Sequence, residues 1–404
     1  MQGISFFNFI SLEGRITMDS SLYAQLCSYK NLGLAFKNAR KGKTKKQYVI
    51  DFEKDLEQNL FKLQTELIFH TYQPEPLQEF ILRDPKTRKI NRSSFKDRIV
   101  HHALCNIIMP IFEKNFIYDS YANRRGKGTF KAIERFDYFK QKVSHNFTQT
   151  TFVLKADIRH YFEAVDHDIL ISILKKKISD GRVLWLINRI ISHYSVKNNS
   201  TQKKKGMPLG NFTSQFFANV YLNELDQFAK HTLQAAYYIR YVDDFVIFHQ
   251  SREVLQSYKE RISHFLREHL ALELHSDKSK IIPLHRGVEF LGMKIFPHHK
   301  RIKQKNLRKF HRKFENICKA YAKKEIQYDV MYEFVEGWLA YVKNANTYTL
   351  QEKVCASMKE KFPHEISSKE VHRERREQRR RIRQLIAMIK RKKNKLISLS
   401  PPSP

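Results

Sequence analysis

The chain has 404 residues, of which 74 are Lys or Arg and 41 are Asp or Glu, so its formal net charge is +33. The excess positive charges repel one another in a compact fold, which favours a polyanionic partner. Nucleic acid is the first candidate, because each neutralised phosphate releases condensed counterions. An anionic membrane surface is the alternative partner. No apolar run approaches the roughly twenty residues that cross a bilayer. The four cysteines form no CxxC pair, and we therefore expect a cytoplasmic protein without membrane association, zinc or disulfides.

The first third of the chain predicts helices interrupted by one basic hairpin. Apolar residues at spacings of three and four predict helical structure over 32–72. The β-type residues of 80–90 surround a strongly charged centre, which predicts a hairpin with a basic turn. Helical spacing returns over 95–116, and a further helix is expected to reach about Val143 after the Gly-containing basic loop 123–128.

The middle of the chain predicts a small antiparallel sheet with acidic residues at the ends of its strands. Residues 151–157 form a short β-rich run that ends on Asp157. Two further β-rich runs over 237–249 surround Asp243 and Asp244, as in a hairpin with polar residues at its turn.

The last third predicts a hairpin over 288–302, helices over 307–358 and a very basic helix over 369–395. The final residues, 398–404, form a Ser/Pro tail without core-forming side chains, for which we expect disorder. One apolar stripe follows the basic helix and leaves three interpretations, namely an RNA-binding arm, a helix that docks on a partner, and a solvated helix without a role. This stripe consists of Ile382, Leu385, Ile386 and Ile389.

The three aspartates indicate two-metal-ion chemistry. Two carboxylates on adjacent strands can bridge two divalent ions, and the substrate phosphates and water then complete the octahedral shells that Mg²⁺ prefers. The backbone carbonyl of Ile158 is a further candidate ligand. The alternative is an exposed acidic turn, since Asp is common in turns. We expect two Mg²⁺ ions, with Mn²⁺ as the alternative, because repelling carboxylates between apolar β-runs need cations.

The segments around these aspartates resemble the conserved motifs of reverse transcriptases. Residues 155–162 resemble motif A, in which an aromatic follows the aspartate after five residues, and 240–244 resemble motif C. Four more segments resemble, in chain order, the triphosphate-binding motif of the fingers, the block that follows it, motif D and the primer grip. These segments are 85–88, 124–128, 272–279 and 289–292.

This resemblance implies an α+β, right-hand polymerase fold with fingers, an antiparallel-sheet palm and a helical thumb, extended here by a basic C-terminal tail. The implied domains are an N-terminal helical extension (1–50), fingers (51–150), a palm with interleaved fingers helices (151–296), a thumb (297–358), and a basic helix with a disordered tail (359–404). The implied partners are template RNA, a cDNA primer and deoxynucleoside triphosphates.

The resemblance also implies roles for individual residues. Phe162 would be the steric gate that excludes a ribose 2′-hydroxyl, the alternative being a core aromatic. Lys86 and Arg88 would clamp the triphosphate, the alternative being a solvated basic loop. Lys278 would donate a proton to pyrophosphate or act only through its charge.

Further implied sites are grouped by role. The remaining nucleotide-binding residues are Leu209, Gly210 and Gln215. The primer grip would consist of Phe290, Leu291 and Gly292. The residues that bind the template RNA would be Arg124, Arg125 and Lys127.

One segment, 206–215, resembles motif B of the reverse transcriptases of diversity-generating retroelements. Leu209 replaces the usual glutamine and Gln215 replaces the second proline, and the segments 97–105 and 117–122 resemble the same group. Such enzymes copy a template RNA into cDNA, misincorporate opposite adenine and work with a small basic accessory protein. The alternatives are a defence-associated, retron-like or group II intron-like reverse transcriptase without mutagenic homing. Leu209 would discriminate less between bases than an amide does, or would merely pack.

Overall fold

The computed structural model describes residues 21–83, 87–194 and 204–397. The chain divides into two compact units, the first ending at Pro283 and the second beginning at Leu284. No helix within these ranges is long and apolar enough to span a bilayer. The palm is expected to end at residue 296, whereas the strands after Pro283 already group with the C-terminal helices.

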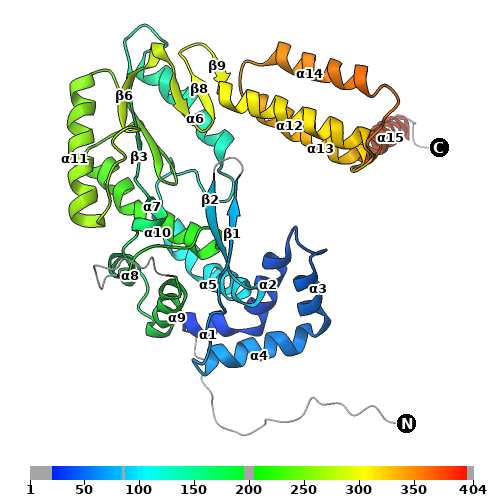
Figure 1. Ribbon diagram of the computed structural model, residues 1–404. Helices are drawn as coiled ribbons and strands as arrows, with labels where there is room; N and C mark the ends of the chain where they lie inside the picture. The colour runs from blue at the N-terminus through cyan, green and yellow to red at the C-terminus, as the bar shows by residue number, and fades with distance from the viewer. Residues whose placement is uncertain (1–20, 84–86, 195–203, 398–404) are drawn as a thin grey trace, which may run out of the picture. The chain divides into compact units, whose positions relative to one another are not determined.

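The first unit contains a four-stranded antiparallel sheet that lies between α6 and α11 (Figure 1). Alternation along β5 points Phe248 toward Phe136 of α6, whereas Phe245 and Ile247 point to the opposite face and join the cluster that includes Leu255 of α11. Burial on both faces explains why β5 reads as a continuous apolar run. The expected strand and hairpin are thus confirmed. The bounds are β3 Phe152–Asp157, β4 Tyr238–Tyr241, β5 Asp244–His249, β6 Lys280–Pro283, α6 Thr129–Val143 and α11 Arg252–Leu270, and the strand order is β4-β5-β3-β6.

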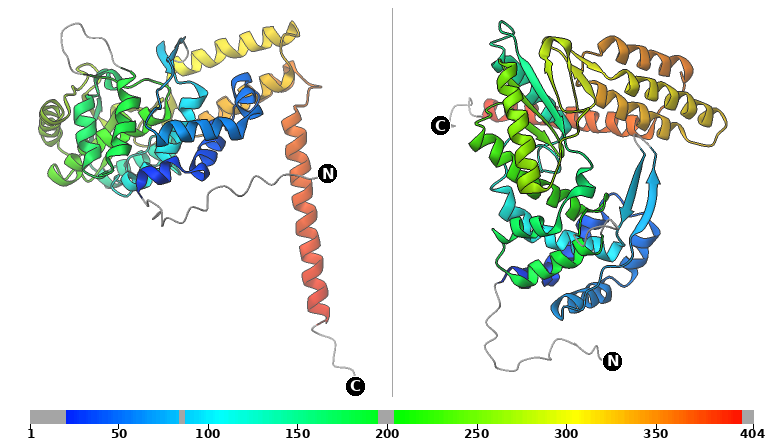
Figure 2. Two further views of the ribbon diagram at one scale, coloured as in Figure 1. Left: turned by 90° about the horizontal axis from the view of Figure 1, so that it is seen from below. Right: turned by 60° about the vertical axis from the view of Figure 1, so that its left-hand side comes forward.

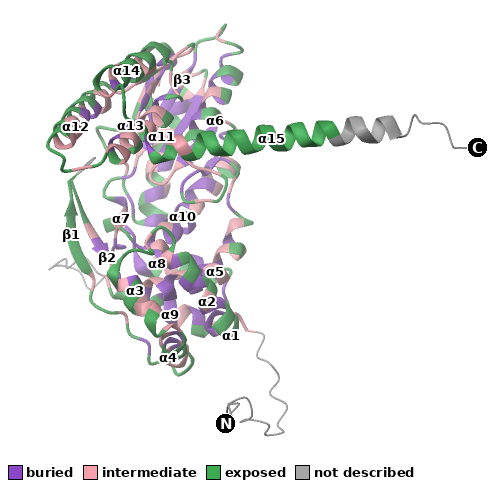
Figure 3. Cartoon of the chain, turned by 90° about the vertical axis from the view of Figure 1, so that its right-hand side faces the viewer, coloured by how far each residue is buried: buried purple, intermediate pink, exposed green. Residues whose placement is uncertain are grey.

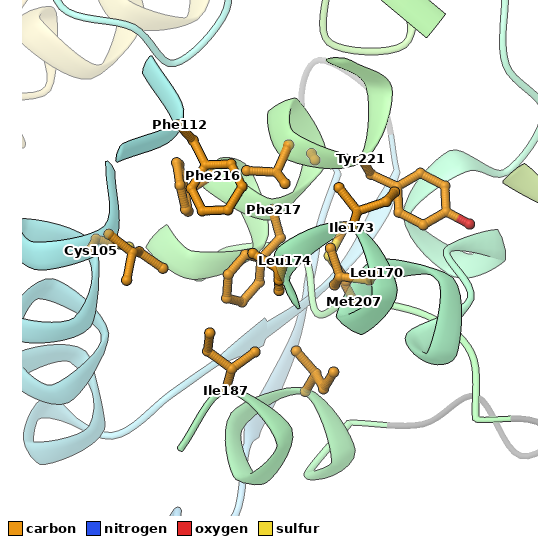
Figure 4. Close-up of a cluster of buried hydrophobic side chains, with 14 of the residues drawn as sticks. Cys105, Phe112, Leu170, Ile173, Leu174, Ile187, Met207, Phe216, Phe217 and Tyr221 are labelled. Carbon is orange, nitrogen blue, oxygen red and sulfur yellow. The ribbon is translucent and has the colours of Figure 1, made fainter. Parts of the chain in front are cut away.

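Helix α10 (Phe212–Gln227) forms the centre of the first unit. Most of its residues are buried, polar ones such as Ser214, Asn219 and Asp226 included, and it packs against α5, α8 and α11. Figure 4 shows Phe216 and Phe217 of α10 facing Phe112 and Cys105 of α5 and Leu174 of α8. The remaining helices around it are α5 Phe95–Glu113, α7 Tyr161–Ala164, α8 His167–Lys175, α9 Gly181–Ser192 and the π-helix Phe228–Thr232.

Three helices replace the single helical stretch expected over 32–72, with interruptions at 41–46 and at Asp55. Both α1 and α2 pack on α5, so the expected N-terminal extension belongs to the same core as the fingers. Figure 2 shows this helical group at one end of the first unit, with the expected basic hairpin of β1 and β2 rising from it. The bounds are α1 Leu22–Cys27, α2 Tyr29–Arg40, α3 Gln47–Lys54, α4 Leu56–Ile68, β1 Gln78–Leu82 and β2 Arg88–Arg92.

The second unit joins a three-stranded meander, β7-β8-β9, to α12, α13 and α14, which precede α15. The run 288–295, expected as one strand of a hairpin, is divided by a turn at Leu291 and Gly292, which both have positive φ. Phe310, Met331 and Val354 share a small apolar cluster among the helices. The bounds are η2 Leu284–Arg286, β7 Val288–Phe290, β8 Met293–Ile295, β9 Lys300–Ile302, α12 Gln304–Ala322, α13 Tyr328–Val342 and α14 Tyr348–Lys361.

The expected basic helix is α15, Ser368–Ile397. Its first turns are attached to α13, because Ser368 donates hydrogen bonds to Asp329 and Arg373 forms an ion pair with Glu336. Beyond these turns its described side chains are exposed, as Figure 3 shows in green, and the apolar stripe that includes Ile382 and Ile389 is 48–62 % exposed.

Candidate active site

Three carboxylates gather at one end of the four-stranded sheet. Asp157, the last residue of β3, lies directly opposite Asp244, the first residue of β5. Asp243 precedes it in the two-residue turn between β4 and β5, and its backbone carbonyl accepts a hydrogen bond of 3.2 Å from the Ile158 amide. The sequence brings the three residues together because the two strands pair in this register.

The turn itself is strained and is held by a buried ion pair. Val242 has a φ of 56°, which is unfavourable for a β-branched residue and costs of order 1–3 kcal/mol. The Arg240 guanidinium donates to the Val242 carbonyl at 3.1 Å and pairs with Asp226 of α10 at 2.6 Å. Burial opposes the charge, yet the neighbouring Asp226 carboxylate raises the pKa of Arg240. The turn is therefore fixed by a permanently charged side chain without any exposed surface.

A loop after α11 fixes Asp157 and adds a cation. The His275 amide donates to the Asp157 carbonyl at 2.7 Å, and the Asp157 amide donates to Ser279 Oγ at 3.4 Å. Lys278 Nζ lies 3.2 Å from Asp157 Oδ2. Lys278 is a residue that the motif D resemblance predicts. The backbone contacts that hold Asp157 have no signal in the sequence.

The electrostatics of the cluster favour a bound cation. Burial and, next, the charge of Asp157 raise the pKa of Asp243 above its ordinary value, while Arg88 and Lys278 oppose this shift. Within 21–83, 87–194 and 204–397, no group of three His, Cys, Asp or Glu side chains is arranged to hold an ion by itself. An open set of carboxylates fits Mg²⁺ nevertheless, because this ion usually takes one or two protein carboxylates and completes its shell with phosphate oxygens and water.

A loop before α10 connects the motif A segment to the β1–β2 hairpin. The Met207 amide donates to the carbonyl of Phe162 at 2.6 Å, and the Leu209 carbonyl accepts from the Asn91 amide at 3.0 Å. Phe162 and Leu209 are both half-buried, and Phe162 packs against the main apolar cluster with part of its ring. Part of the Phe162 ring and part of the Leu209 side chain therefore remain exposed.

Gly210 is required by this connection. Its φ is +118°, and a Cβ added there would lie 2.9 Å from Ile90 Cγ2 and 3.4 Å from the Asn91 carbonyl oxygen. Asn211 follows and accepts a hydrogen bond of 3.2 Å from the Ser93 amide through its Oδ1. The loop and the hairpin are thereby held in close contact within the first unit.

The model of the family "Reverse transcriptase (RNA-dependent DNA polymerase)" matches residues 83–295, which include the three aspartates, the 206–215 loop and Lys278. This match covers more than half of the chain. The chain belongs to the reverse transcriptase family. Members of this family generally use divalent metal ions, and the right-hand polymerase fold is confirmed by the match together with the antiparallel sheet and its helices.

Curated relatives of this reverse transcriptase include intron-encoded proteins. Protein YkfC of Escherichia coli K12 is 27 % identical over 269 residues, which is 58 % of this chain and 70 % of YkfC. The group II intron-encoded protein LtrA of Lactococcus lactis subsp. cremoris is 23 % identical over 305 residues, covering 59 % of this chain and 50 % of LtrA. The chain therefore spans about half the length of LtrA. The retroelement subtype suggested by the 206–215 segment has no counterpart among these names.

Among solved structures, a telomerase of Candida tropicalis, in complex with the TWJ fragment of telomeric RNA, matches with a TM-score of 0.46 and 13 % identity. The matched region covers 74 % of this chain and 58 % of the telomerase chain. A telomerase of Candida albicans matches with a TM-score of 0.43 and 12 % identity, covering 61 % and 51 %.

The remaining residues expected to bind the nucleotide differ in exposure, and one of them lies outside the described residues. Arg88 begins β2, is exposed and lies near enough to Asp243 to lower the pKa of that carboxyl. Gln215 is half-buried in the first turn of α10. Lys86 lies outside the described residues.

Two of the three residues expected to bind RNA contact the reverse transcriptase's own backbone. Arg124 donates to the carbonyls of Ile117 and Ser120 at 2.7 and 3.0 Å, and burial lowers the pKa of its guanidinium. Lys127 donates to the Tyr118 carbonyl at 2.9 Å. Arg125 is exposed. Arg124 and Lys127 thus hold the loop in its conformation, which the basic composition of 123–128 did not predict.

The expected primer grip lies in the turn between β7 and β8. Phe290 is buried, while Leu291 and Gly292 are partly exposed. The Gly292 carbonyl accepts hydrogen bonds from Tyr341 Oη of α13 at 3.0 Å and from Asn306 Nδ2 of α12 at 3.3 Å. Helices of the second unit therefore fix the backbone of this turn.

Proposed function

We propose that this reverse transcriptase is an active RNA-directed DNA polymerase whose catalytic carboxylates are Asp157, Asp243 and Asp244. The observation that carries the proposal is their convergence at the β3–β5 register, beside a strained turn that a buried ion pair holds in place. Such strain persists only where the surroundings over-determine it, and it is common at functional sites.

Two Mg²⁺ ions are the proposed cofactors, with Mn²⁺ as the alternative. When bound, they would lower the pKa of the primer 3′-hydroxyl and neutralise the triphosphate and leaving pyrophosphate. Asp157 and Asp243 would hold the ions, with Asp244 and the Ile158 carbonyl as further candidates. Their negative charge at this end of the sheet supports cation binding, since burial and, next, the charge of Asp157 raise the pKa of Asp243, and a bound cation would offset both effects.

Side chains around the carboxylates would bind the incoming deoxynucleotide. Phe162 would form the floor beneath the sugar, and Leu209 with Gly210 would form a wall, because one loop joins both to the fingers hairpin. Arg88 and Lys86 would contact the triphosphate from the hairpin, where a planar guanidinium suits phosphate oxygens. Lys278, 3.2 Å from Asp157, would supply positive charge or a proton to the leaving pyrophosphate.

The proposed biological role is mutagenic copying of a template RNA in a diversity-generating retroelement, with a small basic accessory protein. The support for this role is Leu209 in the position that a glutamine occupies in most reverse transcriptases. A leucine offers contact area without directional hydrogen bonds, so the pocket would tolerate mispairs more readily. Its half-buried side chain, on the loop that contacts Phe162, is compatible with contact to a base pair.

The second candidate is a group II intron-like reverse transcriptase without mutagenic homing. It is favoured by the relatives, because LtrA is a group II intron-encoded protein and is similar over 305 residues. The two candidates share the polymerase chemistry and differ in fidelity.

An error spectrum separates these candidates and tests Leu209. The measurement is sequencing of cDNA made on a defined RNA at equal deoxynucleotide concentrations, with and without the accessory protein. For the retroelement enzyme we expect errors concentrated at template adenines, and we expect Leu209→Gln to reduce them by roughly five- to a hundredfold, the value of one polar contact. Accurate copying of adenine by the wild type would favour the intron-like candidate. Unchanged adenine errors in an active Leu209→Gln enzyme would show that Leu209 merely packs.

A further inference from the structure

Cations and tyrosines alternate in a row beside α6. Lys127 Nζ lies 3.3 Å from the centre of the Tyr118 ring, and the Arg135 guanidinium lies 5.3 Å from the same ring. The other side of Arg135 is 5.0 Å from the Tyr138 ring, which Lys142 Nζ approaches to 5.8 Å. We call these five residues the α6 row.

The rings of the row face solvent. Tyr118 is 68 % exposed and Tyr138 is 46 % exposed, whereas Phe136 and Phe139 on the opposite side of α6 are buried against the sheet. The tyrosines also line a hollow of about 280 Å³, slightly smaller than the roughly 300–1,000 Å³ of small-molecule sites. The rings are therefore not core residues of α6, and space remains beside them for another flat group.

The charge around the row is positive. Lys131 is paired with Glu134 at 2.9 Å, and Arg135 with Asp119 at 2.7 Å. Lys127 and Lys142 add two further cations to these pairs, so the row and its neighbours keep a positive excess. Aromatic faces combined with cations match unpaired nucleic acid, whose bases stack on rings and whose phosphates contact Lys and Arg. A duplex fits less well, because its bases are already stacked on one another.

The row begins next to the catalytic turn. Thr129 Oγ1, in the first turn of α6, donates to Tyr241 Oη at 3.1 Å, directly before Val242. From there α6 continues for 15 residues, or about 22 Å at 1.5 Å per residue. Alternation along β3 puts Asp157 on the same face of the sheet as Val153, whose partner Phe248 contacts α6. The row thus leads away from the carboxylates along one face of the first unit.

We propose that the α6 row binds an unpaired strand of nucleic acid adjoining the active site. Bases stack on Tyr118 and Tyr138, and phosphates contact Lys142 of the row and the neighbouring Lys131. The two sources of such a strand are template RNA outside the copied region and single-stranded cDNA, which share this chemistry.

The test is the binding of labelled oligonucleotides of about 12 nucleotides, within the site sizes of single-strand binding folds. Fluorescence anisotropy of the full chain is measured with single-stranded RNA, single-stranded DNA and an RNA–DNA duplex. We expect Tyr118→Ala/Tyr138→Ala to weaken binding of a single strand by roughly tenfold or more and to leave duplex binding within about twofold. Tyr118→Phe/Tyr138→Phe should bind like the wild type, because phenylalanine keeps the stacking face.

Matched controls come from the same unit. Tyr29→Ala removes a tyrosine that is 45 % exposed on α2, and Lys62→Ala removes an exposed cation of α4; both should bind single strands like the wild type. Lys131→Gln/Lys142→Gln should reduce the salt slope of single-strand binding by about 1.4, or about 0.7 per phosphate. Thermal unfolding of each variant should match the wild type, which ties any loss to the surface.

The outcomes decide both the proposal and its source. Loss confined to RNA identifies template RNA, loss confined to DNA identifies cDNA, and loss of both supports a site for either. Single-strand affinity within twofold of the wild type in the alanine double variant overturns the proposal. Equal losses for duplex and single strand, or equal losses in the phenylalanine variant, overturn it too, because neither fits stacking of unpaired bases.

Discussion

At the scale of single residues, the chemistry of this reverse transcriptase depends on how three carboxylates share one end of a sheet. Asp157 and Asp244 lie opposite each other on paired strands, and Asp243 follows the strained Val242 in the turn between β4 and β5. Each carboxylate has a different environment. Lys278 faces Asp157 at 3.2 Å, and Lys155 faces Asp244 at 3.7 Å, whereas burial and the charge of Asp157 raise the pKa of Asp243.

Asp243→Asn should abolish primer extension while leaving RNA affinity within about twofold. The substitution removes negative charge that divalent ions need and leaves every phosphate-binding cation in place. The measurement is extension of an annealed primer in Mg²⁺ alongside RNA binding by filter retention. Comparable extension by the variant would exclude Asp243 as a catalytic ligand.

The same substitution predicts a change in how stability depends on pH. Because the pKa of Asp243 is raised in the folded chain, the folded state holds this proton more tightly, and the resulting stability is lost as the pH rises through that pKa. In EDTA, Asp243→Asn should lack this loss and unfold at a higher temperature than the wild type near neutral pH. A difference in unfolding temperature between variant and wild type that is the same below and above the ordinary pKa of an aspartate would contradict the raised pKa.

Phe162→Ala should admit ribonucleotides. The half-buried ring packs partly against the core and keeps part of its surface exposed, so its removal would open space for a 2′-hydroxyl. The measurement is the ratio of kcat/KM for rNTP and dNTP, which should rise by roughly tenfold or more, about the value of 1.4 kcal/mol. Phe162→Tyr is the matched control, because it keeps the ring and should keep the preference. An unchanged ratio in the alanine variant would place the gate elsewhere.

At the scale of elements, turns are fixed by side chains that belong to other elements. The turn between β4 and β5 is held by Arg240 and Asp226, and the turn between β7 and β8 is held by Tyr341 and Asn306. In the first turn, Asp226 of α10 holds the arginine that donates to the turn carbonyl. In the second turn, helices supply both donors directly. The positions of the carboxylates and of the expected primer grip therefore depend on helix packing.

Gly292→Ala should destabilise the second unit by roughly 1–3 kcal/mol. A Cβ there would lie 2.6 Å from Tyr341 Oη, and the φ of +88° is unfavourable for alanine. Gly337→Ala in α13 is the control, since nothing lies within 4 Å of its added Cβ, and it should stabilise the helix by up to about 1 kcal/mol. Urea unfolding measures both changes.

Removing the hydroxyl group should separate the clash from the backbone strain. Gly292→Ala combined with Tyr341→Phe should recover part of the lost free energy of unfolding, although the Tyr341 hydrogen bond to the Gly292 carbonyl is lost. A double variant that is less stable than the sum of the single changes would show that the hydrogen bond matters more than the close approach.

At the scale of the whole molecule, the net charge of +33 predicts steep salt dependence of RNA binding. Much of the excess lies on α15, whose described side chains are exposed beyond its attachment to α13. The three interpretations of this helix differ in one measurable quantity, which is the number of phosphates that it neutralises.

Replacing Arg379, Arg380 and Arg381 by glutamine tests these interpretations together. If α15 is an RNA-binding arm, the slope of log affinity against log salt concentration should become shallower by about 2, or about 0.7 for each phosphate contact on a single strand. The measurement is RNA binding between about 50 and 400 mM KCl. An unchanged slope would leave the helix solvated or docked on a partner through its apolar stripe.

Local sequence was sufficient wherever a feature depends on neighbouring residues. The alternating β-rich runs predicted β3 and the β4–β5 hairpin, and the placement of Asp157, Asp243 and Asp244 followed from motif spacing. Periodicity also predicted most helices, though it merged α2, α3 and α4. The apolar spacing continues across Asp55, from Phe52 to Leu56, whereas the basic run 41–46 contains no apolar residue and marks a break.

Only the tertiary structure decided what each charged side chain contacts. Arg124 and Lys127 look like RNA ligands in a basic loop, yet both donate to nearby backbone carbonyls, because an unpaired carbonyl is costly once it is partly buried. The partner of Arg240 is Asp226, which lies in a different element and has no sequence signal. The α6 row combines residues from the 118–127 segment with one face of α6. Such contacts arise from the way loops and helices pack, which a pattern of neighbouring residues does not encode.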